Sequence, residues 1–139
     1  MPLYLVMSEP GTVPHEEKEA VAMAFTDIHR SLTFAPASFV HVYFLEQPMG
    51  EAPMKCFISG NIRADRSDAV KEQIMERMRS TLAQTVGCSI DEVQMSISDS
   101  PANWTMEGGH LLPAAGEEDA WLERHEAMIN AMAADSRAG

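Results

Sequence analysis

The chain has 139 residues, of which 45% are hydrophobic and 22% charged, and this is the composition of an ordinary folded domain. Its net charge of −11 argues against nucleic-acid and anionic-membrane partners, because binding to phosphate groups needs a basic surface. No apolar run approaches the roughly 20 residues of a membrane span, and residues 1–7 lack the basic region of a signal peptide. We therefore expect a single domain over residues 1–139.

The first half of the chain predicts a strand, a helix and a second strand. The apolar run at 3–8 is expected to be a strand, and the turn Glu9-Pro10-Gly11 leads into a helix at about 14–32. Residues 39–45 form the next predicted strand. The spacing of apolar residues predicts the buried stripe of the helix to be Val21, Met23, Ala24, Phe25, Ile28 and Leu32.

The second half predicts the same three elements again. A strand is expected from Met54 to Ser59, ending at Gly60, and a further strand over residues 93–98. Between them, Ser67 can cap the start of a helix, and Gly87 stands where a C-cap glycine would end it. The predicted inner face of this helix is Val70, Ile74, Met78, Leu82 and Val86.

The two halves repeat each other, as βαβ units at about 2–48 and 55–101. They superimpose at an offset of 53 residues, which is the distance from Pro48 to Pro101. The same offset pairs Lys18 with Lys71, Leu5 with Ile58, and Pro2 with Lys55. Because crossover connections are right-handed, we expect an α/β (α+β) fold with a mainly parallel four-stranded sheet and two helices on one face.

The other face of that sheet has no predicted cover. It would carry a mixed but partly apolar set of side chains, and such a face is best explained by an oligomer. The set is His41, Tyr43, Leu45, Gln94, Ser96 and Ser98.

The C-terminal part, residues 102–134, follows a different pattern. Residues 102–116 contain adjacent glycines and a proline and predict a loop or short turn. Residues 117–134 predict a third helix. Its expected inner stripe is Trp121, Leu122, His125, Met128, Ile129 and Met132.

Pro2 is the first candidate for chemistry. If Met1 is removed, Pro2 becomes an N-terminal secondary amine, and an α-amino group with a pKa of ~7.7–8.0 suits proton transfer near neutrality. The alternative is that Pro2 only opens an edge strand, where proline is tolerated.

Arg63 and Arg66 are prominent because the chain has only ten Lys and Arg residues. We place them between the third strand and the second helix, where two guanidinium groups could grip a carboxylate and lower the pKa of a nearby amine. The alternative is that both are solvated and pair with Asp65 and Asp68.

Two further candidates have an equally simple alternative. His29 lies late in the first helix, where it is either a packing residue or a proton donor and hydrogen-bonding anchor. Glu107 follows Trp104 in the glycine-containing loop, where it is either a solvated carboxylate or a base with a raised pKa.

Metal and cofactor chemistry has no support in the residue spacing. Cys56 and Cys88 lie in apolar surroundings, and the five histidines form no metal-ligand pattern. The sequence contains no phosphate-binding loop, dinucleotide fingerprint or serine nucleophile elbow. We expect a reduced cytoplasmic protein with buried thiols, no metal and no cofactor.

Taken in order, these residues resemble the tautomerase superfamily and, within it, the cis-3-chloroacrylic acid dehalogenase family. The likeness covers most of residues 2–113 and is weak in the last helix. The segments that carry it are Met1 to Val6, Thr26 to Thr33, Phe44 to Pro48, Arg63 to Ser67, and Pro101 to Pro113 with Glu107 inside it. The resemblance implies two fused βαβ units in a homotrimer, and a cofactor-independent enzyme acting on a small carboxylate.

The resemblance also implies roles for the candidates. Pro2 matches the catalytic amine, and Glu107 matches the base that activates water. Arg63 and Arg66 match the pair that binds and polarises the substrate carboxylate, and His29 matches a further substrate contact. These roles are chemically coherent, because cations fix an unsaturated acid while a base and an ammonium group move protons.

One position departs from the family. Its tyrosine, which assists the water-activating glutamate, is matched here by Ser96, whose hydroxyl is shorter and a far weaker acid. Efficient dehalogenation is therefore in doubt. The alternatives are keto–enol tautomerisation of 2-oxo acids such as phenylpyruvate, with Pro2 as base, and a non-catalytic ferredoxin-like module that binds a ligand or assembles.

Overall fold

The computed structural model describes residues 2–51, 53–107, 109–113 and 116–138. It contains two compact units, Met1–Ser100 and Pro101–Gly139, and we describe each by itself. The boundary falls at Pro101, where the sequence pattern changes.

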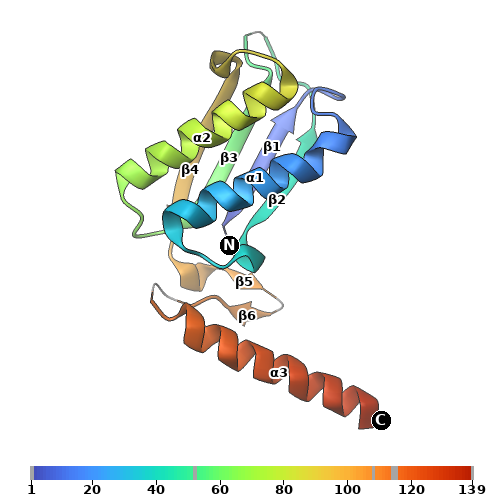
Figure 1. The fold of residues 1–139 in the computed structure, drawn as a ribbon, viewed down its shortest axis with the longest axis vertical. Helices are drawn as coiled ribbons and strands as arrows, with labels where there is room; N and C mark the ends of the chain where they lie inside the picture. The colour runs from blue at the N-terminus through green and yellow to red at the C-terminus, as the bar shows by residue number, and fades with distance from the viewer. Residues whose placement is uncertain (1, 52, 108, 114–115, 139) are drawn as a thin grey trace. The chain divides into compact units, whose positions relative to one another are not determined.

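The first unit is a four-stranded sheet with two helices on one face, as predicted (Figure 1). The strands follow the order β2-β1-β3-β4. The outer pairs β1–β2 and β3–β4 are parallel, whereas the central pair β1–β3 is antiparallel. The sheet is therefore mixed, with each parallel pair belonging to one βαβ unit. The strands are β1 (Leu3–Ser8), β2 (His41–Glu46), β3 (Cys56–Arg63) and β4 (Val93–Ser100).

The two helices confirm the internal repeat. Helices α1 (His15–Thr33) and α2 (Asp68–Val86) have 19 residues each, and both ends are 53 residues apart in the chain. The Ser67 hydroxyl caps α2 by accepting a hydrogen bond from the Val70 N–H at 3.2 Å. Gly87 ends the helix with a φ of 78°, a left-handed conformation that glycine adopts without strain. Short 3₁₀ turns, η1 (Ala37–Phe39) and η2 (Ile90–Glu92), precede β2 and β4.

The core lies between the helices and the sheet. From α1 it takes Val21 and Phe25, but Met23 is 62% exposed, so its predicted place in the buried stripe is wrong. His29 occupies that stripe one turn after Phe25 and is also buried. The other buried apolar side chains of this core include Tyr4, Val6, Cys56, Ile58, Ile62, Ile74, Met78, Leu82 and Val93.

The third strand is longer than predicted. Gly60 does not end β3, which continues through Ile62 to Arg63. The reason is a close approach, because Gly60 pairs with Tyr4 of β1 and a Cβ at Gly60 would lie 3.0 Å from the Tyr4 ring. Glycine at this point makes room for an aromatic side chain.

The 53-residue offset is correct for the helices and the second strands but wrong for the first strands. Leu3 pairs with His41, and Phe57 pairs with Gln94. His41 and Gln94 are 53 residues apart, so β1 and β3 correspond at an offset of 54. Side chains alternate along a strand, so this single residue decides which face each one occupies. Accordingly Ile58, buried in the core, corresponds to Tyr4 rather than to Leu5, and Pro2 corresponds to Cys56 rather than to Lys55.

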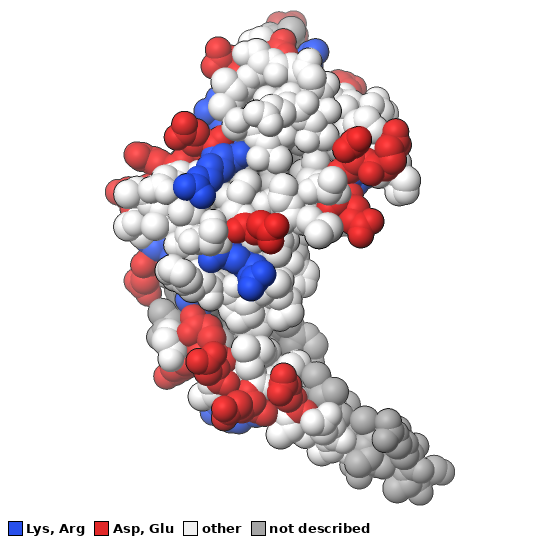
Figure 2. Space-filling model, in the orientation of Figure 1, with Lys and Arg blue, Asp and Glu red and all other residues white. Residues whose placement is uncertain are grey.

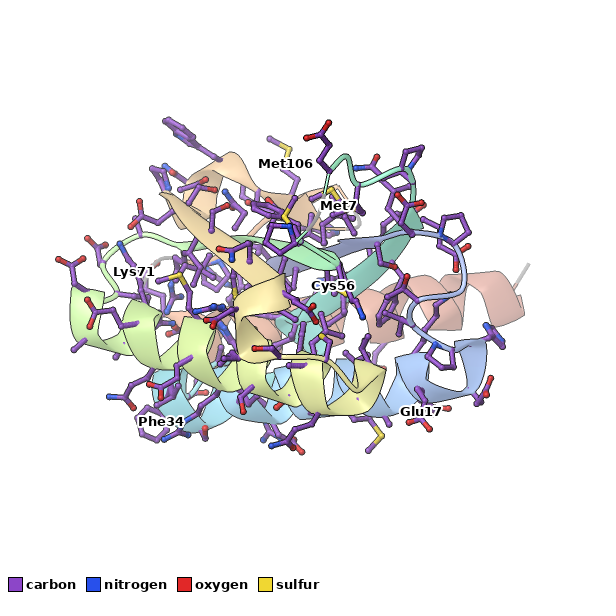
Figure 3. All side chains as sticks on the ribbon, turned by 90° about the horizontal axis from the view of Figure 1, so that it is seen from above. Met7, Glu17, Phe34, Cys56, Lys71 and Met106 are labelled. Atoms are coloured by element: carbon purple, nitrogen blue, oxygen red, sulfur yellow. The ribbon has the colours of Figure 1, made fainter. Side chains whose placement is uncertain are left out.

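Within the first unit, α1 and α2 both lie on the same side of the sheet, as predicted, so neither of them covers the second face (Figure 3). Figure 3 shows Met7 on the side of the sheet away from α1 and α2. We call this second face of the sheet the open face. Leu3 and Tyr43 on it are 45% and 59% exposed. The strand register assigns to it Leu3, Leu5, Met7, His41, Tyr43, Leu45, Phe57, Ser59, Asn61, Gln94, Ser96 and Ser98.

The second unit is a short hairpin followed by the predicted third helix. Strand β5 (Met106–Glu107) pairs with β6 (His110–Leu111) inside the segment expected to be a loop, after the turn η3 (Ala102–Trp104). Helix α3 spans Glu118–Ala138. Trp121 of α3 donates its indole N–H to the Leu111 carbonyl at 2.6 Å and stacks on His125 with ring centroids 4.6 Å apart. The predicted stripe residues Met128, Ile129 and Met132 lie outside the described side chains.

Acidic side chains outnumber basic ones over the face seen in Figure 2, in keeping with the net charge of −11. Across the described residues, no helix has the length and apolar character that crossing a bilayer requires.

Candidate active site

Pro2 lies at one end of the first sheet, directly before β1. It is buried, and it continues the alternation that also buries Tyr4 and Val6. Its carbonyl accepts a hydrogen bond from the N–H of His41 at 2.9 Å, which ties the start of the chain to β2. Because β1 and β3 are antiparallel, the last residues of β3 lie at this same end.

His29 reaches this end of the sheet from α1. The helix runs back along the sheet from the far end of β1, so its last turns come close to the start of β1 (Figure 1). His29 is 2% exposed, and its Nδ1 lies 2.6 Å from the hydroxyl oxygen of Tyr4. The two rings meet edge to face, with centroids 5.7 Å apart. His29 is therefore packed in the interior and its ring is oriented by this contact, while its role as a substrate contact stays a prediction.

Arg63 and Arg66 lie where β3 leads into α2, at the same end of the sheet as Pro2. Arg63 is the last residue of β3 rather than part of the loop, and Arg66 lies in the turn before α2. Asp65 between them has a φ of 76°, a left-handed conformation that reverses the chain within this short turn. Both arginines are half-buried, and their Nε atoms are shielded from solvent. Two cations are thus held at the start of a helix, where anions are already favoured.

The charges of these arginines act on the buried histidine. The pKa of His29 is lowered to about 4, chiefly by burial, then by the positive charge of Arg66 and further by that of Arg63. Burial also raises the pKa of Tyr4 well above its ordinary value, and Arg66 opposes this shift. Both side chains are therefore neutral at pH 7, so the arginines supply the positive charge here.

Tyr4 and Gly60 complete the arrangement, and we did not identify either as a site residue from the sequence. Tyr4 is fully buried and also meets Phe25 edge to face, with centroids 6.2 Å apart. A signal was present, because alternation in β1 places Tyr4 beside Val6 on the buried face and a buried phenol requires a hydrogen-bond partner. His29 is that partner.

The other two candidates, Ser96 and Glu107, lie on other elements of the chain. Ser96 is exposed in the middle of β4 on the open face, opposite Ser59, while Tyr4 and His29 lie on the helical side. Glu107 belongs to the second unit, where it pairs with His110 in the hairpin. The Glu107 side chain is outside the described residues, so its approach to Pro2 stays a prediction.

Within the described part of the chain, no cluster of His, Cys, Asp or Glu could hold a metal ion. Cys56 is buried, as expected, and its burial raises the pKa of the thiol to about 11, while Cys88 is half-buried. Neither thiol is poised as a nucleophile, because the thiolate is the reactive form.

A duplicated βαβ sheet that holds a proline at its first strand, with a histidine and two arginines beside it, defines a protein of the tautomerase fold. The chain belongs to the family described as putative oxalocrotonate tautomerase enzymes, whose model matches residues 1–126. The resemblance to the tautomerase superfamily is therefore confirmed. No curated protein matches the sequence.

Solved structures agree with this assignment. N1, a member of the cis-3-chloroacrylic acid dehalogenase family, is 30% identical with a TM-score of 0.79, and the match covers 86% of this chain and 89% of that one. A fused 4-OT that forms a symmetric trimer is 22% identical with a TM-score of 0.69, over 82% of this chain and 98% of that one. Macrophage migration inhibitory factor of Toxoplasma gondii has 10% identity and a TM-score of 0.69, over 79% and 99% of the chains. These last two likenesses concern the fold alone.

Proposed function

We propose that this protein is a cofactor-independent enzyme that uses the amine of Pro2 as acid or base on a small unsaturated carboxylate. The most direct support is that Pro2 is buried at the end of the sheet where the two arginines and His29 also lie. There, the positive charges of Arg63 and Arg66 are close enough to lower the pKa of the buried His29. Such a site attracts an anionic substrate to a proton-transferring group.

In the proposed hydration, the arginines hold the substrate carboxylate and draw electrons from the conjugated double bond. Glu107 takes a proton from water, and the oxygen forms a bond to the β-carbon. The Pro2 ammonium then delivers a proton to the α-carbon. If the β-carbon carries a halide, the product is a halohydrin, whose hydroxyl proton passes to water as the halide leaves with its electron pair, and an aldehyde forms. Nearby positive charge lowers the pKa of a cationic acid, so the arginines would make the Pro2 ammonium a stronger proton donor in this step.

Keto–enol tautomerisation is the second candidate, and the position of Ser96 favours it. A serine on the open face has neither the reach nor the acidity of the tyrosine that assists water activation in the family. Tautomerisation requires only Pro2 as base and a bound 2-oxo acid, and the family description names a tautomerase. It makes no use of Glu107.

We further propose that the enzyme is a homotrimer assembled through the open face. This face exposes Leu3 and Tyr43, and both helices of the first unit lie on the opposite side of the sheet, so a partner would remove apolar surface from water. A trimer is also recorded for a fused 4-OT with the same fold. Assembly would bring Ser96 of each subunit against a second copy.

The test is an NMR assay of wild type and Pro2→Ala on cis-3-chloroacrylate, a three-carbon acetylenic acid and phenylpyruvate. We expect turnover of at least one substrate by the wild type and a loss of about a hundredfold or more in Pro2→Ala, because proton-transfer groups contribute about 10²–10⁴-fold. Equal rates for both proteins would refute a role for Pro2.

Glu107→Gln separates the two candidate reactions. It should abolish hydration and leave tautomerisation intact, and survival of both activities would show that Glu107 is not the base. A non-catalytic module is distinguished by intact mass, because a retained Met1 turns the amine of Pro2 into an amide nitrogen without basicity.

A further inference from the structure

We propose that Tyr4 is a positioning residue that fixes one tautomer of His29, so that the Nε2–H of the imidazole can donate a hydrogen bond to the substrate carboxylate. The inference rests on the proposed function for its last step, the contact with substrate. Its first step, the choice of tautomer, concerns only the protein.

The direction of the hydrogen bond follows from the hydrogen-bonding groups of the two side chains. Tyr4 is fully buried, and among the described residues the hydrogen-bond partner of its hydroxyl is Nδ1 of His29, at 2.6 Å. If Nδ1 carried the proton, it would donate to the phenol oxygen, and the phenol hydrogen would be buried without an acceptor. The phenol hydrogen has an acceptor only if the Tyr4 O–H donates to an unprotonated Nδ1. This arrangement places the ring hydrogen of His29 on Nε2.

The surroundings hold this pair in place. Gly60 lies opposite Tyr4, and any side chain there would meet the tyrosine ring at 3.0 Å, so the ring fits where only glycine leaves room. Phe25 of α1 also contacts the ring edge to face. The tyrosine ring is therefore packed against both β3 and α1, and the hydrogen bond of its hydroxyl orients His29.

A neutral donor suits this position better than a charged one. Arg63 and Arg66 already place two positive charges near His29, and a third would repel them. An Nε2–H group adds a directional hydrogen bond to a carboxylate that the arginines bind, and it adds no charge. Histidines that bind metals follow the same rule, since the partner at one ring nitrogen decides what the other can do.

The tautomer is tested without substrate, by long-range ¹H–¹⁵N NMR of histidine-labelled protein at neutral pH. In the wild type, Nδ1 of His29 should show a pyridine-type shift and Nε2 a pyrrole-type shift. In Tyr4→Phe the two shifts should move toward averaged values, because the hydrogen that selects the tautomer is gone. Tyr43→Phe is the matched control, because Tyr43 is the other tyrosine and lies on the open face. A pyrrole-type Nδ1 in the wild type, or unchanged shifts in Tyr4→Phe, would overturn the proposal.

Kinetics test the contact with substrate. Tyr4→Phe should raise KM for the carboxylate by about three- to tenfold and change kcat by less than about twofold. The reason is that the weakened His29 contact stabilises the bound substrate and the transition state equally. In a His29→Leu background, adding Tyr4→Phe should have no further effect on KM, and an equal further loss would show that Tyr4 is merely structural.

Leucine and phenylalanine together leave no buried polar group unpaired, so the double variant is expected to fold. If the wild type turns over none of the substrates but shows the Nε2–H tautomer, and Tyr4→Phe loses it, the proposed function fails and the role of Tyr4 stands. If the wild type is active but carries the proton on Nδ1, the proposed function stands and the role of Tyr4 fails.

Discussion

Gly60 faces Tyr4 across the antiparallel β1–β3 ladder, and a Cβ on Gly60 would lie 3.0 Å and 3.1 Å from two carbons of the tyrosine ring. Ile97 closes the same space from β4, at 3.3 Å. Because Gly60 has no side chain, the Tyr4 ring fits between the sheet and the helices. This contact connects the packing of the sheet to the orientation of His29.

Gly60→Ala should lower the free energy of unfolding by about 1–3 kcal/mol, the usual effect of overpacking a filled core. The measurement is urea denaturation followed by circular dichroism. Ser59→Ala is the matched control, because Ser59 is the neighbouring residue of β3 and its side chain lies on the open face. A Gly60→Ala protein as stable as wild type would mean that the ring does not fill this space.

His29 should make stability depend on pH in a defined window. Its pKa is about 4 in the folded state against an ordinary value of 6.5, so the unfolded chain binds the proton first as pH falls. The stabilisation is present above pH 6.5 and is lost as pH falls toward 4, by on the order of 3 kcal/mol. His29→Leu should flatten this part of the profile, whereas His15→Gln, at an exposed position of α1, should not. Parallel profiles for wild type and His29→Leu would contradict the assignment.

Arg66→Gln should weaken the binding of a substrate carboxylate and raise the pKa of His29 above its wild-type value. The second effect follows because the charge of Arg66 opposes protonation of the imidazole. We expect KM to rise about 10–100-fold, the effect of losing a charge-assisted hydrogen bond. Kinetics and an NMR titration of His29 measure the two effects, and Arg77→Gln on the exposed surface of α2 is the control. An unchanged His29 titration would place Arg66 outside electrostatic range.

Tyr43→Glu should dissociate the proposed trimer, because it puts a charge into a face that assembly would bury. The mass in solution is measured by size-exclusion chromatography with light scattering. Met23→Glu is the matched control, since Met23 is 62% exposed on α1 while Tyr43 is 59% exposed on β2. Dissociation by Met23→Glu alone would move the interface to the helices.

Trp121→Phe should loosen the hairpin of the second unit by about 0.5–1.5 kcal/mol, because the indole N–H that bonds the Leu111 carbonyl is lost while stacking on His125 is kept. Hydrogen exchange over residues 106–111 is the measurement. Trp104→Phe, at a position that is 75% exposed in the same unit, should leave the exchange unchanged. If Glu107 acts from this hairpin, hydration should fall with the loss of protection.

Local patterns in the sequence determined the helices and the number of strands in the first unit. Ser67 and Gly87 mark the ends of α2 through hydrogen-bonding and φ preferences that belong to single residues, and the 53-residue repeat then locates α1. The same repeat relates two helix–strand ion pairs. Lys18 lies 3.4 Å from Glu46, and Lys71 lies 2.5 Å from Asp99 at the corresponding position. Residue type and order also singled out Pro2, His29, Arg63 and Arg66 as candidates, and their catalytic and binding roles stay predictions.

Only the tertiary structure decided what surrounds these candidate residues. Whether Gly60 ends a strand or admits a ring depends on which residue stands opposite, and that residue, Tyr4, is distant in the chain. The one-residue shift between β1 and β3 has the same origin, because pairing across strands sets the register and a local pattern does not. The bond between Tyr4 and His29 joins two elements that are adjacent only in the folded sheet, so burial and packing, rather than sequence order, select the histidine's partner.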